Sequence, residues 1–156
     1  MEQYIFIDTN IIVDSIDKTR EYHKQARYFI TYCYKQQITL VLSEDMISTI
    51  FYIFKKNSKE QKEAEKLINC FQTINNNPKY FKITNFGQDV INKACQNFLN
   101  KGGDFEDYLQ YYCAEKEKCR FILTSDKKFL KLNMEIPIKN YDELDSCFGE
   151  SYIKPH

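Results

Sequence analysis

Two short apolar runs, far apart in the sequence, constrain the fold of this chain most strongly. One is Tyr4–Ile7, near the N-terminus, and the other lies within residues 120–123. Both are continuously apolar rather than alternating, which is typical of strands that are buried on both faces. Strands of this kind occur in parallel sheets that helices cover on each side. The two runs therefore predict an α/β fold with a largely parallel sheet.

The rest of the chain alternates short strand-like runs with longer stretches of helical periodicity. We expect strands at 4–7, 38–42, 80–83 and 120–123, with a weaker fifth at 136–138. Apolar residues at three-to-four spacing predict helices at 22–35, 45–56, 60–73, 87–99 and 104–117. This alternation predicts a three-layer α/β/α domain with a largely parallel sheet of four to five strands, formed by residues 1–156 as a single domain.

Acidic residues stand where two of these strands end. Asp8 directly follows the first strand, and Asp126 lies just past the strand at 120–123. In open α/β sheets, ligands bind at the carboxyl ends of the strands. Asp104 and Asp107 follow a Gly-Gly turn and would share one face at the start of a helix. We therefore expect these four carboxylates to meet at one edge of the sheet.

Each of these acids also has an ordinary structural interpretation. Asp8 and Asp104 are suitable helix N-caps, and Asp107 would then occupy the N3 position of a capping box. Asp126 could simply begin a turn, and Glu106 is expected to face solvent. Capping does not exclude a functional site, however, because a cap keeps its carboxylate at the helix end. If each of the four acids had only its structural role, their meeting at one sheet edge would require four independent coincidences. A single functional site is the simpler explanation.

The composition of this site indicates which ion it would take. Several carboxylates in one cleft cannot all stay ionised unless a cation neutralises them. The six cysteines are scattered without a C-x-x-C pair, and His23 is interpreted as a packing or surface residue, so zinc has little support. Oxygen ligands suit Mg²⁺ or Mn²⁺, and the natural chemistry is phosphodiester hydrolysis. Asp8 and Asp107 are the expected ligands, and Asp104 and Asp126 would bind a second ion or orient water.

The bulk composition excludes little. With 22 basic and 22 acidic residues, the net charge is no evidence for nucleic-acid binding. The lysine clusters at 55–62 and 127–131 are either solvated faces or local RNA-binding patches. The twelve Phe and twelve Tyr residues are expected mostly to pack in the core, although exposed ones could stack on bases. No apolar run approaches the ~20 residues that span a bilayer. We expect a cytoplasmic protein with no membrane partner.

Three sequence blocks resemble the motifs of PIN domains. They are Phe6–Asn10, the run Asp104–Gln110 (D-F-E-D-Y-L-Q), and Ile122–Phe129 (I-L-T-S-D-K-K-F). Their order and separation are similar to those of the family over residues 4 to about 140. The pattern looks like that of VapC-type toxins of bacterial toxin–antitoxin pairs and of related stand-alone PIN proteins. The resemblance implies an Mg²⁺- or Mn²⁺-dependent ribonuclease acting on RNA, often a homodimer, which a cognate antitoxin inhibits.

The resemblance also implies roles for particular residues. The acids of the family fall on Asp8, Asp107 and Asp126, with Asp104 as an additional acid nearby. Asn10 and Ser125 match helper positions that hydrogen-bond the carboxylates or water.

One position departs from the pattern of the family. PIN nucleases usually carry a Glu about six residues after a Ser that ends the second strand. Here that Ser is Ser43, and the residue six positions later is Thr49. Both are retained as supporting residues. Glu44 and Asp45 are acids in a different register and are expected in the first turn of the following helix, where negative charge is favourable.

Two other functions stay open on the sequence. The change at Thr49 is also what a PIN-fold module that has lost catalysis, and binds nucleic acid or protein instead, would show. A phosphatase that attacks through an aspartyl nucleophile would need a second Asp two residues after the first, where this chain has Asn10.

Overall fold

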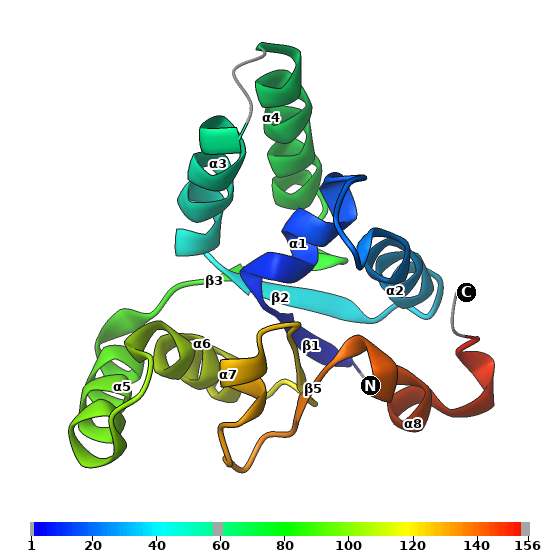
Figure 1. Cartoon of the computed structure of the whole chain (residues 1–156). Coiled ribbons are helices and arrows are strands. Elements are labelled where there is room, and N and C mark those ends of the chain that lie inside the picture. Colours follow the sequence, from blue (N-terminus) through cyan, green and yellow to red (C-terminus); the bar gives the residue numbers. More distant parts are fainter. Residues whose placement is uncertain (1, 58–60, 154–156) are drawn as a thin grey trace.

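The computed structural model describes residues 2–57 and 61–153, and within them strands and helices alternate (Figure 1). The strands are β1 (Tyr4–Ile7), β2 (Thr39–Ser43), β3 (Phe81–Thr84), β4 (Ile122–Leu123) and β5 (Ile138–Lys139). The longer helices are α1 (Thr9–Ile16), α2 (His23–Lys35), α3 (Asp45–Asn57), α4 (Gln61–Asn76), α5 (Gly87–Lys101) and α6 (Phe105–Lys116). Four short helical segments complete the described part of the chain: α7 (Lys127–Leu130), η1 (Tyr141–Glu143), α8 (Leu144–Phe148) and η2 (Gly149–Ser151).

The described strands form one parallel sheet in the order β3-β2-β1-β4-β5. β1 is the central strand, and Phe6 pairs with Val41 of β2 on one side and with Ile122 of β4 on the other. Ile5, Phe6 and Ile7 are completely buried. The prediction from the continuous apolar runs, a parallel sheet covered on both faces, is confirmed.

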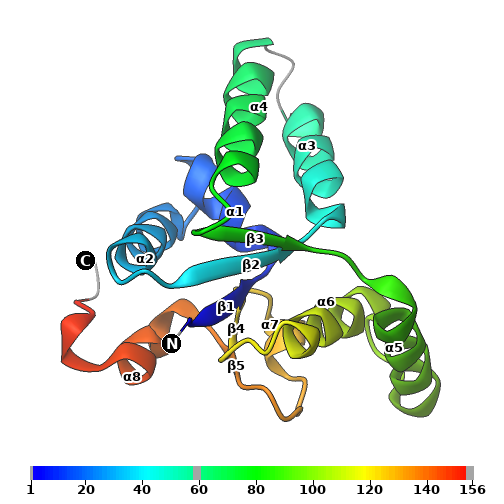
Figure 2. The ribbon, with the colours of Figure 1, turned by 180° about the vertical axis from the view of Figure 1, so that it is seen from behind.

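Helices cover both faces of this sheet. In both views, α3 and α4 lie on one side of β2 and β3, and α5 and α6 lie on the other side (Figures 1 and 2). The predicted three-layer α/β/α architecture is therefore confirmed. None of the helices in the described part of the chain is long and apolar enough to cross a membrane.

The observed boundaries differ from the predicted ones mainly at the C-terminal side. β4 covers only Ile122 and Leu123, although backbone hydrogen bonds continue outside it: the amide of Arg120 donates to Tyr4 O at 2.8 Å. The weak fifth strand begins at Ile138 rather than at residue 136. α4 runs to Asn76, beyond the predicted end at 73, and the predicted first residue of that helix, 60, lies outside the described residues.

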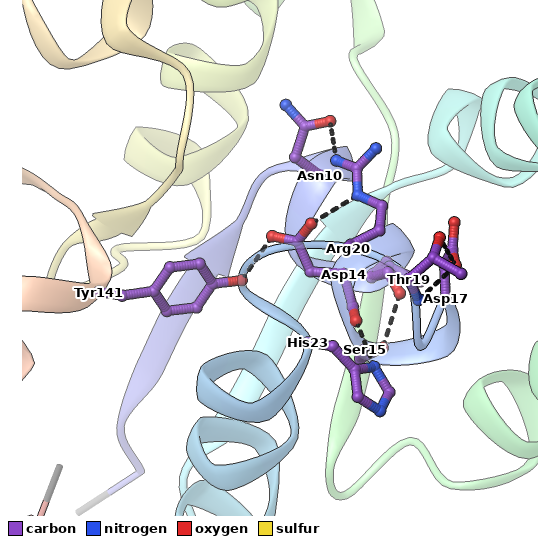
Figure 3. A network of polar contacts seen from close by, with 9 residues as sticks. Asn10, Asp14, Ser15, Asp17, Thr19, Arg20, His23 and Tyr141 are labelled. Carbon is purple, nitrogen blue, oxygen red and sulfur yellow. Dashed lines mark hydrogen bonds and ion pairs between the residues drawn. The ribbon is translucent and has the colours of Figure 1, made fainter. Parts of the chain in front are cut away.

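A buried polar network ties the C-terminal segment to α1 (Figure 3). The Asp14 side chain is almost completely buried and accepts a hydrogen bond from Arg20 Nε at 2.7 Å and another from Tyr141 Oη at 2.9 Å. His23 Nδ1 lies 2.8 Å from the backbone oxygen of Asp14. Because a buried carboxylate needs such partners, this network fixes η1 against the N-terminal helix.

The hydrogen bond from Tyr141 to Asp14 gives a stability prediction. Tyr141→Phe keeps the ring but leaves a buried carboxylate with one donor fewer, so we expect it to destabilise the fold by roughly 1.5–3 kcal/mol, the range for hydrogen bonds to charged groups. Urea unfolding measures the change. The control is Tyr34→Phe on α2, whose ring is 57% exposed and which we expect to change stability by less than about 0.5 kcal/mol. Equal effects of the two changes would contradict the assigned role of the network.

Candidate active site

Asp8 and Asp126 are brought together by the pairing of the two central strands. The backbone amide of Asp8 donates to Leu123 O at 3.0 Å, so β1 and β4 end at the same level. Thr124 links the two acids: its hydroxyl donates to Asp8 Oδ2 at 2.8 Å and accepts from the amide of Asp126 at 3.0 Å. Thr124 is fully buried. Thr124 is not among the predicted site residues, although its place between an apolar strand and Asp126 was a usable signal.

Asp104 and Asp107 open helix α6 after the predicted glycine turn. Gly102 and Gly103 both have positive φ, which favours glycine, and Tyr108 Oη donates to Gly102 O at 2.7 Å and so holds the turn. Asp104 caps α6 and is exposed, whereas Asp107, in the first turn, is only 7% exposed. The turn therefore sets the position at which both carboxylates enter the site.

The predicted capping roles of Asp8 and Asp104 are confirmed, and Asp126, which was expected only to begin a turn, also caps a helix. Asp8 caps α1 by accepting from the amide of Thr9 at 2.7 Å, and Asp104 accepts from the amide of Glu106 at 2.9 Å. Asp126 caps α7 by accepting from the amide of Lys128 at 2.8 Å. Helix N-termini stabilise negative charge. Three converging helix starts therefore allow three carboxylates to lie near one another.

Asp107 is not a cap, and its electrostatics differ accordingly. Burial and, after it, the nearby charges of Asp104, Asp126 and Asp8 together raise the pKa of Asp107 to about 7. Burial also raises the pKa of Asp8, although hydrogen bonds from Thr124 and Thr9 partly oppose this. Acids at the end of β1, in α6 and at the start of α7 thus act on one another.

Glu106 lies closer to these acids than the sequence analysis expected. It is exposed, as predicted, but burial and then the charges of Asp45, Asp104 and Asp8 raise the pKa of its carboxyl. Its Oε1 accepts from Gln110 Nε2 at 3.4 Å. The prediction that Glu106 faces solvent is therefore confirmed, and in addition the nearby acids act on its carboxyl.

The four predicted supporting residues differ in what their side chains contact. Asn10 Oδ1 accepts from Arg20 Nη2 at 3.5 Å, and the partly buried Ser125 lies beside Asp126 (Figure 3 shows Asn10). Ser43 is fully buried and donates to the carboxylate of Asp45. By contrast, the Thr49 hydroxyl donates to Asp45 O at 3.1 Å, within its own helix. Thr49 thus uses its hydroxyl on α3 itself.

The residues present fit a hard divalent cation. Two buried side-chain oxygens within residues 2–57 and 61–153 have no hydrogen-bond partner, Thr9 Oγ1 and Gln110 Oε1, and both belong to residues that contact Asp8. In the same described part, no three His, Cys, Asp or Glu side chains approach closely enough to chelate an ion as they stand. Like-charged carboxylates keep apart when nothing neutralises them. Unneutralised acids beside unpaired oxygens are the donor set that Mg²⁺ or Mn²⁺ prefers.

The raised pKa of Asp107 gives a prediction for the metal-free protein. Its ordinary value is 3.8 and the folded value is about 7, so the folded state holds the proton more tightly. This contribution to stability is fully present below about pH 4 and is lost as the pH rises through 7. In EDTA at pH 8, Asp107→Asn should therefore raise the free energy of unfolding by roughly 1–3 kcal/mol, since one pKa unit corresponds to about 1.4 kcal/mol.

Urea unfolding at pH 5 and pH 8 checks this expectation. The control is Asp89→Asn on α5, whose carboxylate is 78% exposed and pairs with Lys93 at 3.4 Å. An Asp107→Asn variant that loses stability between pH 5 and 8 as steeply as the wild type would contradict the assignment.

Comparisons with known proteins agree with this geometry. A family model described as "PIN domain" matches residues 4–128. The chain is 31% identical to Ribonuclease VapC1 of Aquifex aeolicus (strain VF5) over 138 residues, which cover 85% of this chain and 88% of that protein.

Solved structures share the fold at low sequence identity. VapC20 of Mycobacterium tuberculosis, described as a sarcin-ricin loop cleaving toxin, superposes with a TM-score of 0.61 at 12% identity and covers 97% of this chain and 99% of that one. VapBC2 from Rickettsia felis, bound to a DNA fragment from its promoter, gives a TM-score of 0.64 at 19% identity, with 88% and 98% covered. With its strand-end acids, its parallel sheet and these relatives, the chain belongs to the PIN domain family.

Proposed function

We propose that this protein is an endoribonuclease that hydrolyses RNA phosphodiester bonds with Mg²⁺ or Mn²⁺. One observation carries the proposal: Asp8, Asp107 and Asp126, from three separate parts of the chain, act on one another at the carboxyl end of the central strands. The relative with 31% identity bears the name of a ribonuclease, which favours this substrate class.

Each acid has a distinct task in this proposal. Asp8 and Asp107 would hold the cation, and Asp126 and Asp104 would orient water or hold a second ion. When bound, the cation would neutralise the phosphodiester and make water a better nucleophile. Thr124 keeps the Asp8 carboxylate in place through Oδ2, and the amide of Thr9 does so through Oδ1. Asp8 is thereby oriented before any ligand arrives.

The surroundings of the acids suit a polymeric substrate. Asp104 and Glu106 are exposed and Asp126 is partly exposed, so the acidic edge opens to solvent. Lys127 and Lys128, both exposed, follow Asp126 directly and could meet the RNA backbone. Lys55 and Lys56 of the other cluster lie in the last turn of α3, at the far end from Asp45, and Lys59 falls outside the described residues. Of the lysines that these clusters contribute to residues 2–57 and 61–153, the ones directly after Asp126 lie beside the proposed site.

A first test is cleavage of a labelled RNA in the presence of Mn²⁺. Asp8→Asn should reduce the rate by about a hundredfold or more, because loss of a ligand exceeds the roughly 10–100-fold effect of outer partners. Its thermal unfolding should stay cooperative. Asp89→Asn, an exposed acid on α5, serves as the control and should cleave like the wild type. Metal-dependent cleavage that survives in both Asp8→Asn and Asp107→Asn would refute the proposal.

The second candidate is a non-catalytic PIN-fold module, which the Thr49 position favours because its hydroxyl is turned into α3. Calorimetric titration with Mn²⁺ separates the two functions. Saturable heat that disappears in Asp8→Asn favours the enzyme. Absence of heat in the wild type favours the module.

We further propose that the protein is the toxin of a type II toxin–antitoxin pair, acts in the cytoplasm and forms a homodimer. Solved structures of the same fold include VapBC2 from Rickettsia felis and FitAcB from Neisseria gonorrhoeae, the latter with a TM-score of 0.65 at 12% identity. Ile91, Phe98 and Leu99 of α5 are exposed apolar side chains that a second copy could cover.

Expression in bacteria tests the toxin proposal. The wild type should arrest growth, and Asp8→Asn should not, because arrest would depend on RNA cleavage. Co-expression of a small neighbouring gene product with an amphipathic tail should restore growth. Growth arrest by Asp8→Asn at equal protein levels would contradict a toxic effect based on cleavage.

A further inference from the structure

The proposed site lacks an acid at the position where PIN nucleases usually carry a Glu. Thr49 stands there, and its hydroxyl is committed to Asp45 O. The structure places another carboxylate beside the same acids. Glu106 is adjacent in sequence to Asp107, in the first turn of α6, and the charges of Asp45 and Asp8 both act on it. The site therefore has a candidate for the missing negative charge on a different helix.

Gln110 connects Glu106 to the rest of the site. Its Nε2 lies 3.4 Å from Glu106 Oε1, one helical turn away, and its amide lies close enough to Asp8 to lower the pKa of that carboxyl. The Gln110 side chain is only 2% exposed. One buried amide thus contacts carboxylates from two elements, the end of β1 and the start of α6.

The oxygen of the Gln110 amide indicates that this site can accept a further ligand. Gln110 Oε1 is buried and has no hydrogen-bond partner. Exchanging the nitrogen and oxygen would not remove the problem, because the oxygen would then face two carboxylates and the donor would be left unpaired. A buried acceptor without a partner costs roughly 1–3 kcal/mol. A hydrated divalent cation would supply the missing partner, either directly or through one of its waters.

We propose that Glu106, positioned by Gln110, supplies the fourth carboxylate of the metal site in place of residue 49. This inference rests on the proposed metal dependence of the protein. Asp45 is the competing acid, and its carboxylate accepts from Ser43 at the start of α3. Glu106 by contrast is held by a residue that also holds Asp8. Gln110 is a positioning residue, and it acts through these two acids.

Mn²⁺ binding by the full-length protein tests this assignment without relying on activity. Free Mn²⁺ is measured by electron paramagnetic resonance during titration of the wild type, Glu106→Gln, Gln110→Leu and the double variant. Glu106→Gln should weaken binding by about 10- to 100-fold, the range for residues that support a metal site. Because Gln110 acts partly through Glu106, the loss of affinity in the double variant should be smaller than the sum of the losses in the two single variants.

Two matched variants serve as controls. Glu115→Gln removes the same charge from the same helix, but its carboxylate pairs with Lys93 at 2.8 Å, so Mn²⁺ affinity should stay unchanged. Asp45→Asn tests the competing acid and should weaken binding less than Glu106→Gln does. Thermal unfolding in EDTA establishes that each variant is folded, and Glu106, being exposed, is open to substitution.

The outcomes are distinguishable. Wild-type affinity in Glu106→Gln, or a larger loss in Asp45→Asn, would overturn this inference while leaving the proposed nuclease intact. Fully additive losses in the double variant would overturn the positioning role of Gln110. If the wild type itself binds no Mn²⁺, the proposed metal dependence fails, and the assignment of Glu106 fails with it.

Discussion

The pairing of β1 with β4 is the contact on which the site depends. The amide of Asp8 donates to Leu123 O, and this bond aligns the ends of two strands that are separated by most of the chain. Thr124 follows directly and holds both Asp8 and Asp126. Because parallel strands share a carboxyl edge, the helices that start there also bring their capping acids together. The register of the sheet therefore also sets the positions of the acids in the site.

Electrostatics set a conflict between stability and function at this edge. Asp8, Asp104 and Asp126 each accept a hydrogen bond from a helix-start amide, which compensates for much of their charge. Asp107 caps no helix, and its pKa rises to about 7. The metal-free fold thus keeps a concentration of negative charge that costs stability. In the proposed function this cost has a physical use, because the same negative charge would attract the cation that the chemistry requires.

Much of the architecture could be predicted because it follows from local patterns. The continuous apolar run of β1 required burial on both faces, and the Gly-Gly turn before Asp104 correctly marked the start of α6. The short C-terminal elements were not predicted, since five-residue segments such as α8 carry no clear periodicity. Among the residues of the site, Thr124 and Gln110 escaped notice. Gln110 is an ordinary polar residue in the sequence, and only its burial beside Asp8 distinguishes it, whereas the place of Thr124 just before Asp126 could have indicated it.

The amino-acid sequence by itself determined the fold class, the family and the acids that stand at strand and helix ends, because periodicity and spacing are properties of neighbouring residues. Tertiary structure alone decided which acids lie close enough to raise one another's pKa and which side chains hydrogen-bond them. The helical position of Glu106 suggested an outward direction, yet packing places it where Asp45 and Asp8 act on it. Contacts between residues distant in the chain depend on the register and packing of the elements, and no local pattern encodes those directly.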